Sequence, residues 1–439
     1  MAVDHNLLIL GGSWAGRPAA LWALRQGARV AWVNGDGQTD TSCWPWLLQG
    51  WGHLGRLAAQ GKPLAENQGR LYLNILQERW DARYGCAALA QAGVDVMPEP
   101  GRLIPPLAVE TAGRRLRACA YVLVEPHLPD IPEIEGLRTV GFCWPWDLHR
   151  HPLPQTVAIL GAGAAAVIMA QALQRLGVQV HLFPLAEVNR VDPEIGLGIE
   201  ALLQAEGVAL HGEEPITAIA AGTPSKILHR PAGPLRVDEI ILATQPVFSG
   251  ETWGIDRVGV GYGRQGIRRN AWGRTRQRRL WVAPPEPWEA QAVVQRALGQ
   301  PPWFQRQSPP LQQIDLDPPV CCWGLTEIQA RQHYGNRIRV ERLPWHRLPL
   351  AQWEDDSIGL IKVIRQPAGR LVGVHLWGSR AAELMAQVLG RPAGLGVNPS
   401  WGEAAGLLDN SMPPWQQWFL QTLLTWQRDW TTFRDFDRG

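Results

Sequence analysis

Long apolar runs are missing from this chain of 439 residues, because none approaches the roughly 18 residues that a membrane-spanning helix needs. The N-terminus is typical of a strand rather than of a signal peptide. A large charge of either sign is also missing, since the formal net charge is +2, so neither nucleic acid nor an anionic membrane is expected as the main partner. We therefore expect a cytoplasmic protein without a transmembrane segment, built from two or three domains.

The six cysteines show no C-x2-C pair and no framework spacing. This pattern argues against a disulfide scaffold and against a structural metal site. The adjacent pair Cys321 and Cys322 lies in an apolar run and is predicted to form a buried strand.

Tryptophan, in contrast, is abundant, with 23 residues, many of them in polar company. Some of these side chains must be at the surface, which points to an interface. The sequence Cys-Trp-Pro-Trp occurs twice, at 43–46 and 143–146. Either the repeat is chance in a tryptophan-rich chain, or the two turns pack together as a pair.

The most informative stretch runs from Thr156 to Phe183, TVAILGAGAAAVIMAQALQRLGVQVHLF. It predicts a strand, a tight glycine turn, a helix and a second strand, which is the Rossmann-type unit that binds a dinucleotide. Gly161 allows the turn, Gly163 lets a pyrophosphate approach the backbone, and Ala166 lets the helix pack closely on the strand. The free N–H groups at the start of the helix are suited to an anion.

Residues 6–34 repeat this unit, with a strand at 6–10, a helix through Gln26 and a second strand, ARVAWVN, at 28–34. Ser13 stands at the second glycine position, and Asn34 stands where an acidic residue would hold the ribose hydroxyls. These departures weaken the expected binding without excluding it. The candidate cofactor-binding residues of this turn are Gly11, Gly12, Ser13, Gly16 and Asn34.

The order of the motifs resembles that of the pyridine nucleotide-disulfide oxidoreductases of the dihydrolipoamide dehydrogenase and mercuric reductase type. The resemblance rests on the two glycine turns, HLPDIPEIEG (127–136), VDEIILATQP (237–246), GIRRNAWGRTRQRRLWVAP (266–284) and a last domain from about Pro318. It implies an α/β fold with two Rossmann-like dinucleotide-binding domains, an α+β dimerisation domain and therefore a homodimer. The implied boundaries are 1–148 with 247–310 for the FAD-type domain, 149–246 for the NAD(P)-type domain, and 318–405 for the dimerisation-type domain. The remaining residues, 406–439, have no counterpart in the family and are predicted to form a helical tail from their own pattern.

In that family, hydride from NAD(P)H reduces the flavin, the flavin reduces a C-x4-C disulfide, and a partner-subunit histidine held by a glutamate handles the proton. Here Cys43 and Leu48 fall at the two cysteine positions, while Asn398 replaces the histidine and Glu403 remains. A lone thiol cannot cycle as a disulfide, and asparagine does not titrate near neutral pH. Cys43 and Glu403 are the candidate catalytic residues; alternatively they are a buried small residue and an ordinary surface or interface carboxylate.

The expected cofactors, FAD and either NAD or NADP, follow from the same resemblance. Pro126 and Pro285 replace residues of the flavin cradle, and proline removes a backbone donor and fixes φ. On the nicotinamide side Ile168 replaces the glutamate of the family motif. The second strand ends in Phe183 and a proline, so no acid there favours NAD and no arginine pair favours NADP. Arg190 is the one nearby base and is interpreted as a solvated charge.

Two further segments bear on the choice of partner. The cluster of Arg264, Arg268, Arg269, Arg274, Arg276, Arg278 and Arg279 is interpreted as a solvated face or local anion site rather than a nucleic-acid site. In the tail, apolar residues recur from Trp415 to Phe433 at helical spacing. This amphipathic helix is expected to dock on the protein itself, on a dimer mate, on another protein or at a membrane interface.

Two functions follow from these patterns. The first is a flavin oxidoreductase that takes hydride from NAD(P)H and passes electrons to a non-disulfide acceptor such as a quinone. The second is a non-catalytic dimeric scaffold or nucleotide sensor that acts through its tryptophan-rich surface and tail. The second is favoured by five replacements, at Leu48, Pro126, Ile168, Pro285 and Asn398. The sequence leaves open whether catalysis persists.

Overall fold

The computed structural model describes residues 4–389 except 35–42, 63–65, 125–127, 185–190, 213, 245, 248–252, 264–265, 271, 285–286, 301–310, 354 and 368. The chain divides into two compact units. Unit 1 comprises Met1–Leu185 and His211–Gln307, and unit 2 comprises Ala186–Leu210 and Ser308–Gly439.

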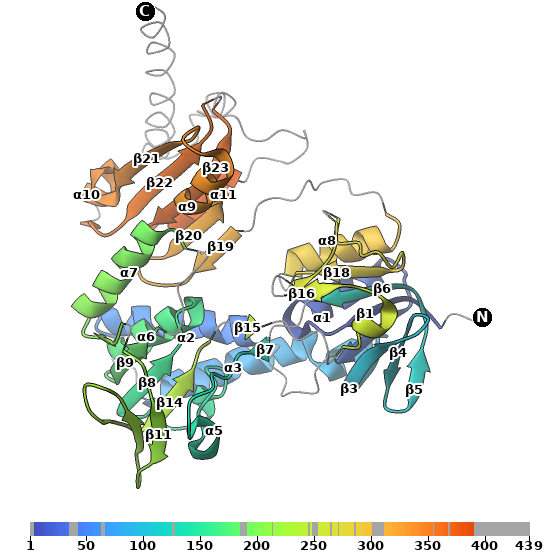
Figure 1. Cartoon of the computed structure of the whole chain (residues 1–439), viewed down its shortest axis with the longest axis horizontal. Helices are drawn as coiled ribbons and strands as arrows, with labels where there is room; N and C mark the ends of the chain where they lie inside the picture. The colour runs from blue at the N-terminus through green and yellow to red at the C-terminus, as the bar shows by residue number, and fades with distance from the viewer. Residues whose placement is uncertain are drawn as a thin grey trace, which may run out of the picture. The chain divides into compact units, whose positions relative to one another are not determined.

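A seven-stranded sheet in unit 1 has the order β18-β6-β1-β2-β3-β4-β5 (Figure 1). Neighbours from β18 to β3 pair in parallel, whereas β3, β4 and β5 form an antiparallel meander. The central strand β1 is apolar without alternation because both faces of a parallel sheet are covered. The strands are β1 (His5–Leu10), β2 (Val30–Asn34), β3 (Asp95–Ile104), β4 (Ala108–Thr111), β5 (Arg114–Leu116), β6 (Ala118–Val124) and β18 (Leu280–Ala283).

Three helices contribute to the core on one face of this sheet, namely α1 (Ser13–Arg25), α4 (Cys86–Ala92) and α8 (Pro287–Ala297). Small side chains on α1, such as Ala19 and Ala23, are fully buried and allow this helix to lie close to the strands. The opposite face carries a second core that includes Trp253 and Ile255. Short elements complete this part: η2 (Asp256–Val258), β16 (Tyr262–Gly263) and β17 (Gly266–Ile267).

A second parallel sheet in unit 1 is centred on β8 (Thr156–Leu160), with β9 (Gln179–Phe183) and β14 (Glu239–Leu242) on either side. Its helix α6 (Ala164–Arg175) follows β8 directly. An antiparallel sheet of β11 (Ala218–Ala221), β12 (Lys226–His229) and β13 (Leu235–Val237), together with α5 (Leu137–Val140), shares a core with the parallel strands.

Two long helices of unit 1 lie between the glycine-turn units in sequence, α2 (Trp44–Ala59) and α3 (Glu66–Tyr84). Helix α2 packs against α6 so closely that a Cβ atom at Gly55 would lie 2.9 Å from the Cα of Ala172. The C-terminal halves of α2 and α6 are therefore in direct contact. The remaining elements of unit 1 are β7 (Leu128–Pro129), η1 (Leu148–Arg150) and β15 (Pro246–Val247), and β7 pairs with β15.

Unit 2 contains a five-stranded antiparallel sheet in the order β19-β20-β23-β22-β21 (Figure 1). Strands β22 and β23 lie on either side of Pro367, and Gly369 between them has a φ of +86°. The strands are β19 (Leu311–Ile314), β20 (Val320–Gly324), β21 (Arg339–Pro344), β22 (Leu360–Arg365) and β23 (Leu371–Trp377). The short strand β10 (Ala209–Leu210) is not part of this sheet. The helices are α7 (Pro193–Ala205), α9 (Glu327–Tyr334), α10 (Pro349–Trp353), α11 (Ala381–Leu389) and the turn η3 (Trp345–Arg347).

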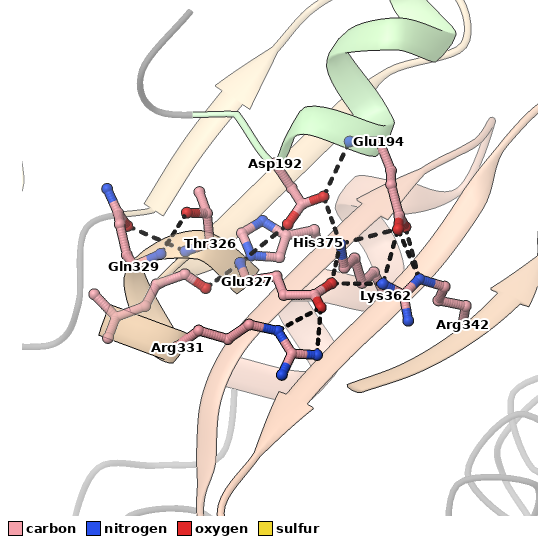
Figure 2. Close-up of polar contacts among 10 residues, drawn as sticks. Asp192, Glu194, Thr326, Glu327, Gln329, Arg331, Arg342, Lys362 and His375 are labelled. Carbon is pink, nitrogen blue, oxygen red and sulfur yellow. Dashed lines mark hydrogen bonds and ion pairs between the residues drawn. The ribbon is translucent and has the colours of Figure 1, made fainter. Parts of the chain in front are cut away.

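An ion network centred on the buried pair Lys362 and Asp192 joins α7 and α9 to the sheet of unit 2 (Figure 2). The ammonium group of Lys362 on β22 lies 2.7 Å from Asp192, 2.8 Å from Glu327 and 3.3 Å from Glu194. Arg342 on β21 closes the network with hydrogen bonds to both glutamates. Asp192 also caps α7 by accepting from the backbone N–H of Glu194 at 3.2 Å. The network therefore fixes the start of α7 on the sheet.

Two Rossmann-type layers and an antiparallel C-terminal sheet confirm the predicted fold class. Within the predicted elements, the strands at 6–10 and 156–160, their helices, and the buried strand at Cys321 and Cys322 are all present. The tail at 406–439 lies outside the described residues.

Candidate functional site

The first glycine turn follows β1 and needs glycine at two successive positions. Gly11 and Gly12 have φ values of +77° and +60°, in the left-handed region that residues with a Cβ atom rarely adopt. A Cβ atom at Gly11 would lie 2.1 Å from the Trp253 ring, and one at Gly12 would lie 2.2 Å from Val124. The turn is thus enclosed by side chains from distant segments, and the role of Trp253 had no signal in the sequence.

Backbone donors of α1 point out of this turn. No side chain caps the N-terminus of α1, and its first turn holds no acidic residue, so the positive end of the helix dipole is not neutralised there. At the third motif position, a Cβ atom on Gly16 would lie 2.5 Å from the carbonyl oxygen of Gly11. Asn34, at the end of β2, donates its amide N–H to the carbonyl of Pro98 at 3.1 Å.

A buried arginine contacts the same turn indirectly, through the ring of Trp32. Arg17 on α1 is 2% exposed, and its guanidinium lies 4.7 Å from the centre of the Trp32 ring. Trp32 in turn donates its indole N–H to the carbonyl of Gly11 at 3.2 Å. These contacts hold the Gly11 carbonyl in a fixed orientation, and sequence reasoning named neither residue.

The second glycine turn joins β8 to α6. Gly161 has a φ of +149°, and a Cβ atom there would lie 2.1 Å from the carbonyl oxygen of Ala243 at the end of β14. Gly163 is the extended N-cap residue of α6, which has no side-chain cap and no acid in its first turn. Ala166 is completely buried, as close packing of helix on strand requires. Ile168 is also buried, at 3% exposure, and is part of the packed face of α6.

A polar cluster lies beside the end of β9, next to this second turn. Phe183 is the last residue of β9, and the imidazole of His211 stacks on its ring with centroids 4.4 Å apart and planes within 8°. His211 contacts His181 at 2.9 Å and Arg230 at 3.0 Å. Arg230 also forms a 2.7 Å ion pair with Glu214. Sequence reasoning missed this cluster because it considered only bases close in sequence to β9, such as Arg190, which lies outside the described residues.

The thiol expected at the dithiol position stands at the start of α2. Cys43 is the N-cap residue of α2 and is 4% exposed, while Leu48 is partly buried one turn later. None of the six cysteines, all of which the structure describes, forms a disulfide. Burial, followed by the charges of Glu239 and Asp147, raises the pKa of Cys143 to about 12. The cysteine of the second Cys-Trp-Pro-Trp motif is therefore protonated and unreactive at neutral pH.

The two Cys-Trp-Pro-Trp turns pack together, which confirms one of the two interpretations of the repeat. The rings of Trp44 and Trp146 meet edge to face with centroids 5.7 Å apart. Trp146 stacks on Trp144 at 4.9 Å. Aromatic edge-to-face and offset contacts stabilise such a pair beyond simple burial.

A second aromatic group connects α2 with the first glycine turn. Trp46 on α2 is 36% exposed and lies 6.1 Å from Trp80 on α3. Trp80 stacks on Trp14, in the first turn of α1, at 4.5 Å. A row of aromatic contacts therefore runs from the glycine turn through the buried Trp80 to the start of α2, close to Cys43 in the sequence.

Several residues of interest have no structural description. Glu403, Asn398, Pro126 and Pro285 lie outside the described residues. Among the residues that the structure does describe, no three His, Cys, Asp or Glu side chains gather as metal ligands would. In the same part of the chain, no helix combines the length and the apolar character that crossing a bilayer requires.

The arginine cluster at 264–279 has partly structural roles. Arg279 donates to the backbone carbonyls of Cys119 and Ala118 on β6. The guanidinium of Arg274 lies 5.7 Å from the centre of the Trp281 ring. These two side chains therefore tie the loop to the sheet of unit 1.

Family models match most of the chain. Residues 5–283 match the model of the pyridine nucleotide-disulphide oxidoreductases, and residues 314–390 match the dimerisation domain of that family. Mercuric reductase of Staphylococcus aureus is 24% identical over 431 residues, covering 87% of this chain and 76% of that protein. Mercuric reductase of Shigella flexneri is 25% identical over 427 residues, covering 87% and 74%.

Solved structures give the same fold. LpdA from Mycobacterium tuberculosis has a TM-score of 0.79 at 17% identity, covering 95% of this chain and 99% of that one. The HOCl-induced flavoprotein disulfide reductase RclA from Escherichia coli has a TM-score of 0.75 at 18% identity, covering 95% and 98%. At these identities the likeness establishes the fold alone.

Proposed function

The chain belongs to the pyridine nucleotide-disulphide oxidoreductase family, as its motifs predicted, and on this premise we propose that it is a flavin oxidoreductase with a non-disulfide acceptor. Hydride would come from NAD(P)H, and the electrons would leave to a planar acceptor such as a quinone. The observation that carries the proposal is the buried thiol of Cys43, with a leucine, Leu48, at the position of its redox partner.

FAD and NAD(P)H are the cofactors of this family, and both glycine turns fit their diphosphates. Each turn leads into a helix whose N-terminal donors are uncapped and without a nearby acid, which is the environment that a diphosphate needs. We assign Gly11, Gly12, Ser13, Gly16 and Asn34 to FAD, and Gly161, Gly163 and Ala166 to NAD(P)H. Bound FAD would supply the hydride chemistry, accepting two electrons and releasing them one or two at a time.

The thiol of Cys43 supports an acceptor other than a disulfide. Dithiol chemistry needs two sulfurs close enough to bridge, one of them a thiolate. Leucine at position 48 supplies no second sulfur, and Asn398 supplies no titratable group at the family's histidine position. Under this proposal Cys43 has only a packing role at the start of α2.

The aromatic group near Cys43 supports a planar apolar acceptor. Trp46 is the exposed member of this group, at 36%, and it lies beside Trp80. Aromatic rings bind planar conjugated molecules through offset stacking. We therefore assign the surface around Trp46 to acceptor binding.

The predicted domain boundaries and the homodimer are also part of this proposal. The match of residues 314–390 to the dimerisation domain supports a homodimer. Light scattering of the purified protein should give twice the chain mass of 48.7 kDa. A single-chain mass over a wide concentration range would contradict the dimer.

The proposed reaction is tested by counting electrons. An enzyme with FAD and a redox dithiol takes up four electrons per subunit, two in each group, whereas FAD alone takes up two. Anaerobic titration of the FAD-loaded protein with dithionite should therefore end at two electrons per flavin, and Cys43→Ser should not change this value. Uptake of four electrons, or NAD(P)H-dependent reduction of a disulfide substrate, would contradict the proposal, as would a protein that binds no FAD.

The acceptor is tested separately. Trp46→Ala should raise the KM for a quinone several-fold while NAD(P)H still reduces the flavin at the wild-type rate. Trp353→Ala is the matched control, because Trp353 is 72% exposed and lies in unit 2. An equal effect of both substitutions would argue against acceptor binding at Trp46.

A further inference from the structure

The carboxyl end of β9 is the place where a Rossmann-type unit distinguishes the two pyridine nucleotides. Phe183 ends β9 and pairs with Leu160, which directly precedes Gly161 of the glycine turn. In such units an acid near this end binds the ribose 2′-hydroxyl of NAD, and an arginine accommodates the 2′-phosphate of NADP. Phe183 and the following proline provide neither group, so the choice depends on side chains from other segments.

Arg230 and His211 supply the missing polar groups at this end. The backbone N–H of His211 donates to the carbonyl of Leu182 on β9 at 2.9 Å, which fixes its ring against Phe183. Arg230 directly follows β12, and its guanidinium lies 5.9 Å from the centre of the Phe183 ring. Both residues therefore contact the last residue of the strand whose end selects the nucleotide.

The hydrogen bonds of this cluster determine where its positive charge lies. Arginine can only donate, so Arg230 Nη1, at 3.0 Å, donates to Nδ1 of His211. His211 then carries its proton on Nε2 and donates to Nδ1 of His181 at 2.9 Å. Burial, and after it the charge of Arg230, lowers the pKa of His211, while burial, His211 and Arg230 lower that of His181. Both imidazoles are therefore neutral at pH 7, and Arg230 is the fixed cation.

Arg230 still has donors to offer. Glu214 accepts from Nη1 of Arg230 at 2.7 Å with one oxygen and from the backbone N–H of Ala232 at 3.0 Å with the other. Nε of Arg230 is buried and has no hydrogen-bond partner among the described residues. Because this atom is enclosed, a ligand cannot reach it, but a guanidinium has five N–H groups and both side-chain hydrogen bonds of Arg230 to described residues use Nη1. Nη2 is therefore the donor that can bind one more anionic acceptor.

We propose that Arg230, positioned by His211 and Glu214, binds the 2′-phosphate of NADPH and makes this chain select NADPH over NADH. The inference rests on the proposed use of a pyridine nucleotide. A phosphate gains charge-assisted hydrogen bonds from the guanidinium. The carboxylate of Glu214 is already paired with Arg230 at 2.7 Å, so its charge is compensated and the cluster offers the 2′-hydroxyl of NADH no unpaired acid.

The test compares two ligands that differ only in the 2′-phosphate, adenosine 2′,5′-bisphosphate and 5′-AMP. Isothermal titration of the full-length protein should show tighter binding of the bisphosphate. Arg230→Gln should weaken bisphosphate binding on the order of 10- to 100-fold, as the loss of charge-assisted hydrogen bonds implies, and leave 5′-AMP binding unchanged. Unchanged 5′-AMP binding also shows that the variant is folded. Arg236→Gln is the matched control, since Arg236 is exposed on β13 and should affect neither ligand.

Glu214→Gln distinguishes binding of the 2′-phosphate by Arg230 from binding of the ribose hydroxyls by Glu214. Removing the carboxylate next to Arg230 should strengthen bisphosphate binding, because a repulsive charge is lost, and should not affect 5′-AMP. Weaker 5′-AMP binding in this variant would mean that Glu214 holds the ribose hydroxyls, which overturns the inference. Equal affinity of the wild type for both ligands would also overturn it while leaving the proposed function intact. Binding of neither ligand would contradict both the inference and the use of a pyridine nucleotide.

Discussion

Replacing Lys362 by methionine removes the ammonium group that three carboxylates of unit 2 share. Lys362 is 1% exposed and Asp192 is completely buried, so the substitution leaves a buried carboxylate without its cation. Breaking one side of a buried ion pair costs about 3–5 kcal/mol. Asp192 keeps backbone N–H bonds from Glu194 and Glu327, at 3.2 and 3.1 Å, which offset part of this cost. We therefore expect the lower end, about 3 kcal/mol, since methionine preserves the apolar stem.

A double-mutant cycle tests the physical origin of this loss. Asp192→Asn removes the charge but keeps an oxygen that can accept from the backbone N–H of Glu194 and cap α7. If the cost of Lys362→Met comes from an uncompensated charge, the double variant should be more stable than the sum of the two single changes predicts. The coupling should fall at the upper end of the range of about 0.5–3 kcal/mol seen for residues in contact.

Urea unfolding followed by tryptophan fluorescence is a suitable assay, because Trp345, Trp323 and Trp377 are buried in unit 2. The matched control is Lys62→Met, because Lys62 is exposed, and it should change stability by less than about 0.5 kcal/mol. A loss below about 1 kcal/mol in Lys362→Met, or additive effects in the cycle, would refute the reasoning.

Three further predictions follow from the same contacts. Cys119 is exposed and should react with a thiol reagent within minutes in the native protein, whereas Cys143, with its pKa raised by burial to about 12, should react only on unfolding. Gly11→Ala should destabilise unit 1 by several kcal/mol and abolish FAD retention, because the new Cβ atom would lie 2.1 Å from the indole ring of Trp253. The control is Gly27→Ala, which has a similar φ but no atom within 4 Å of the new Cβ atom, and it should cost about 1 kcal/mol. Burial by itself raises the pKa of Glu327, but hydrogen bonds from its cationic neighbours outweigh this and lower the pKa overall. The ionised Glu327 therefore stabilises the fold above the ordinary pKa of 4.5, and this contribution is lost as the pH falls through the depressed value. The stability difference between wild type and Glu327→Gln, measured by urea unfolding from pH 7 to pH 3, should shrink in acid.

The comparison of sequence and structure separates local from distant determinants. The two glycine turns were predictable because a left-handed φ at Gly11 and the strand–helix–strand periodicity involve residues close in sequence. The side chain that encloses Gly11 was not predictable, since Trp253 is far from Gly11 in the sequence although the two are in contact in the fold. The same holds for Arg230, because a search restricted to the residues that follow β9 could not find a cation on another sheet.

The pairing of the two Cys-Trp-Pro-Trp turns shows the limit of motif analysis. The repeat was visible in the sequence, but whether it was chance or contact depended on where α2 and the turn at 143–146 lie. The structure places Trp44 against Trp146, so the repeat marks a packing contact. Composition alone carried no information on this choice.

The sequence by itself determined the order of strands and helices, the glycine positions and the family, because backbone sterics and side-chain periodicity act over a few neighbouring residues. Only the tertiary structure decided which polar groups meet, such as Lys362 with Asp192, which are 170 residues apart. A buried charge is stabilised by whichever partners the fold brings within about 3 Å, and that distance is set by the packing of whole layers. The ion pairs, the aromatic contacts and the cluster at Arg230 therefore follow from the tertiary structure and not from the sequence alone.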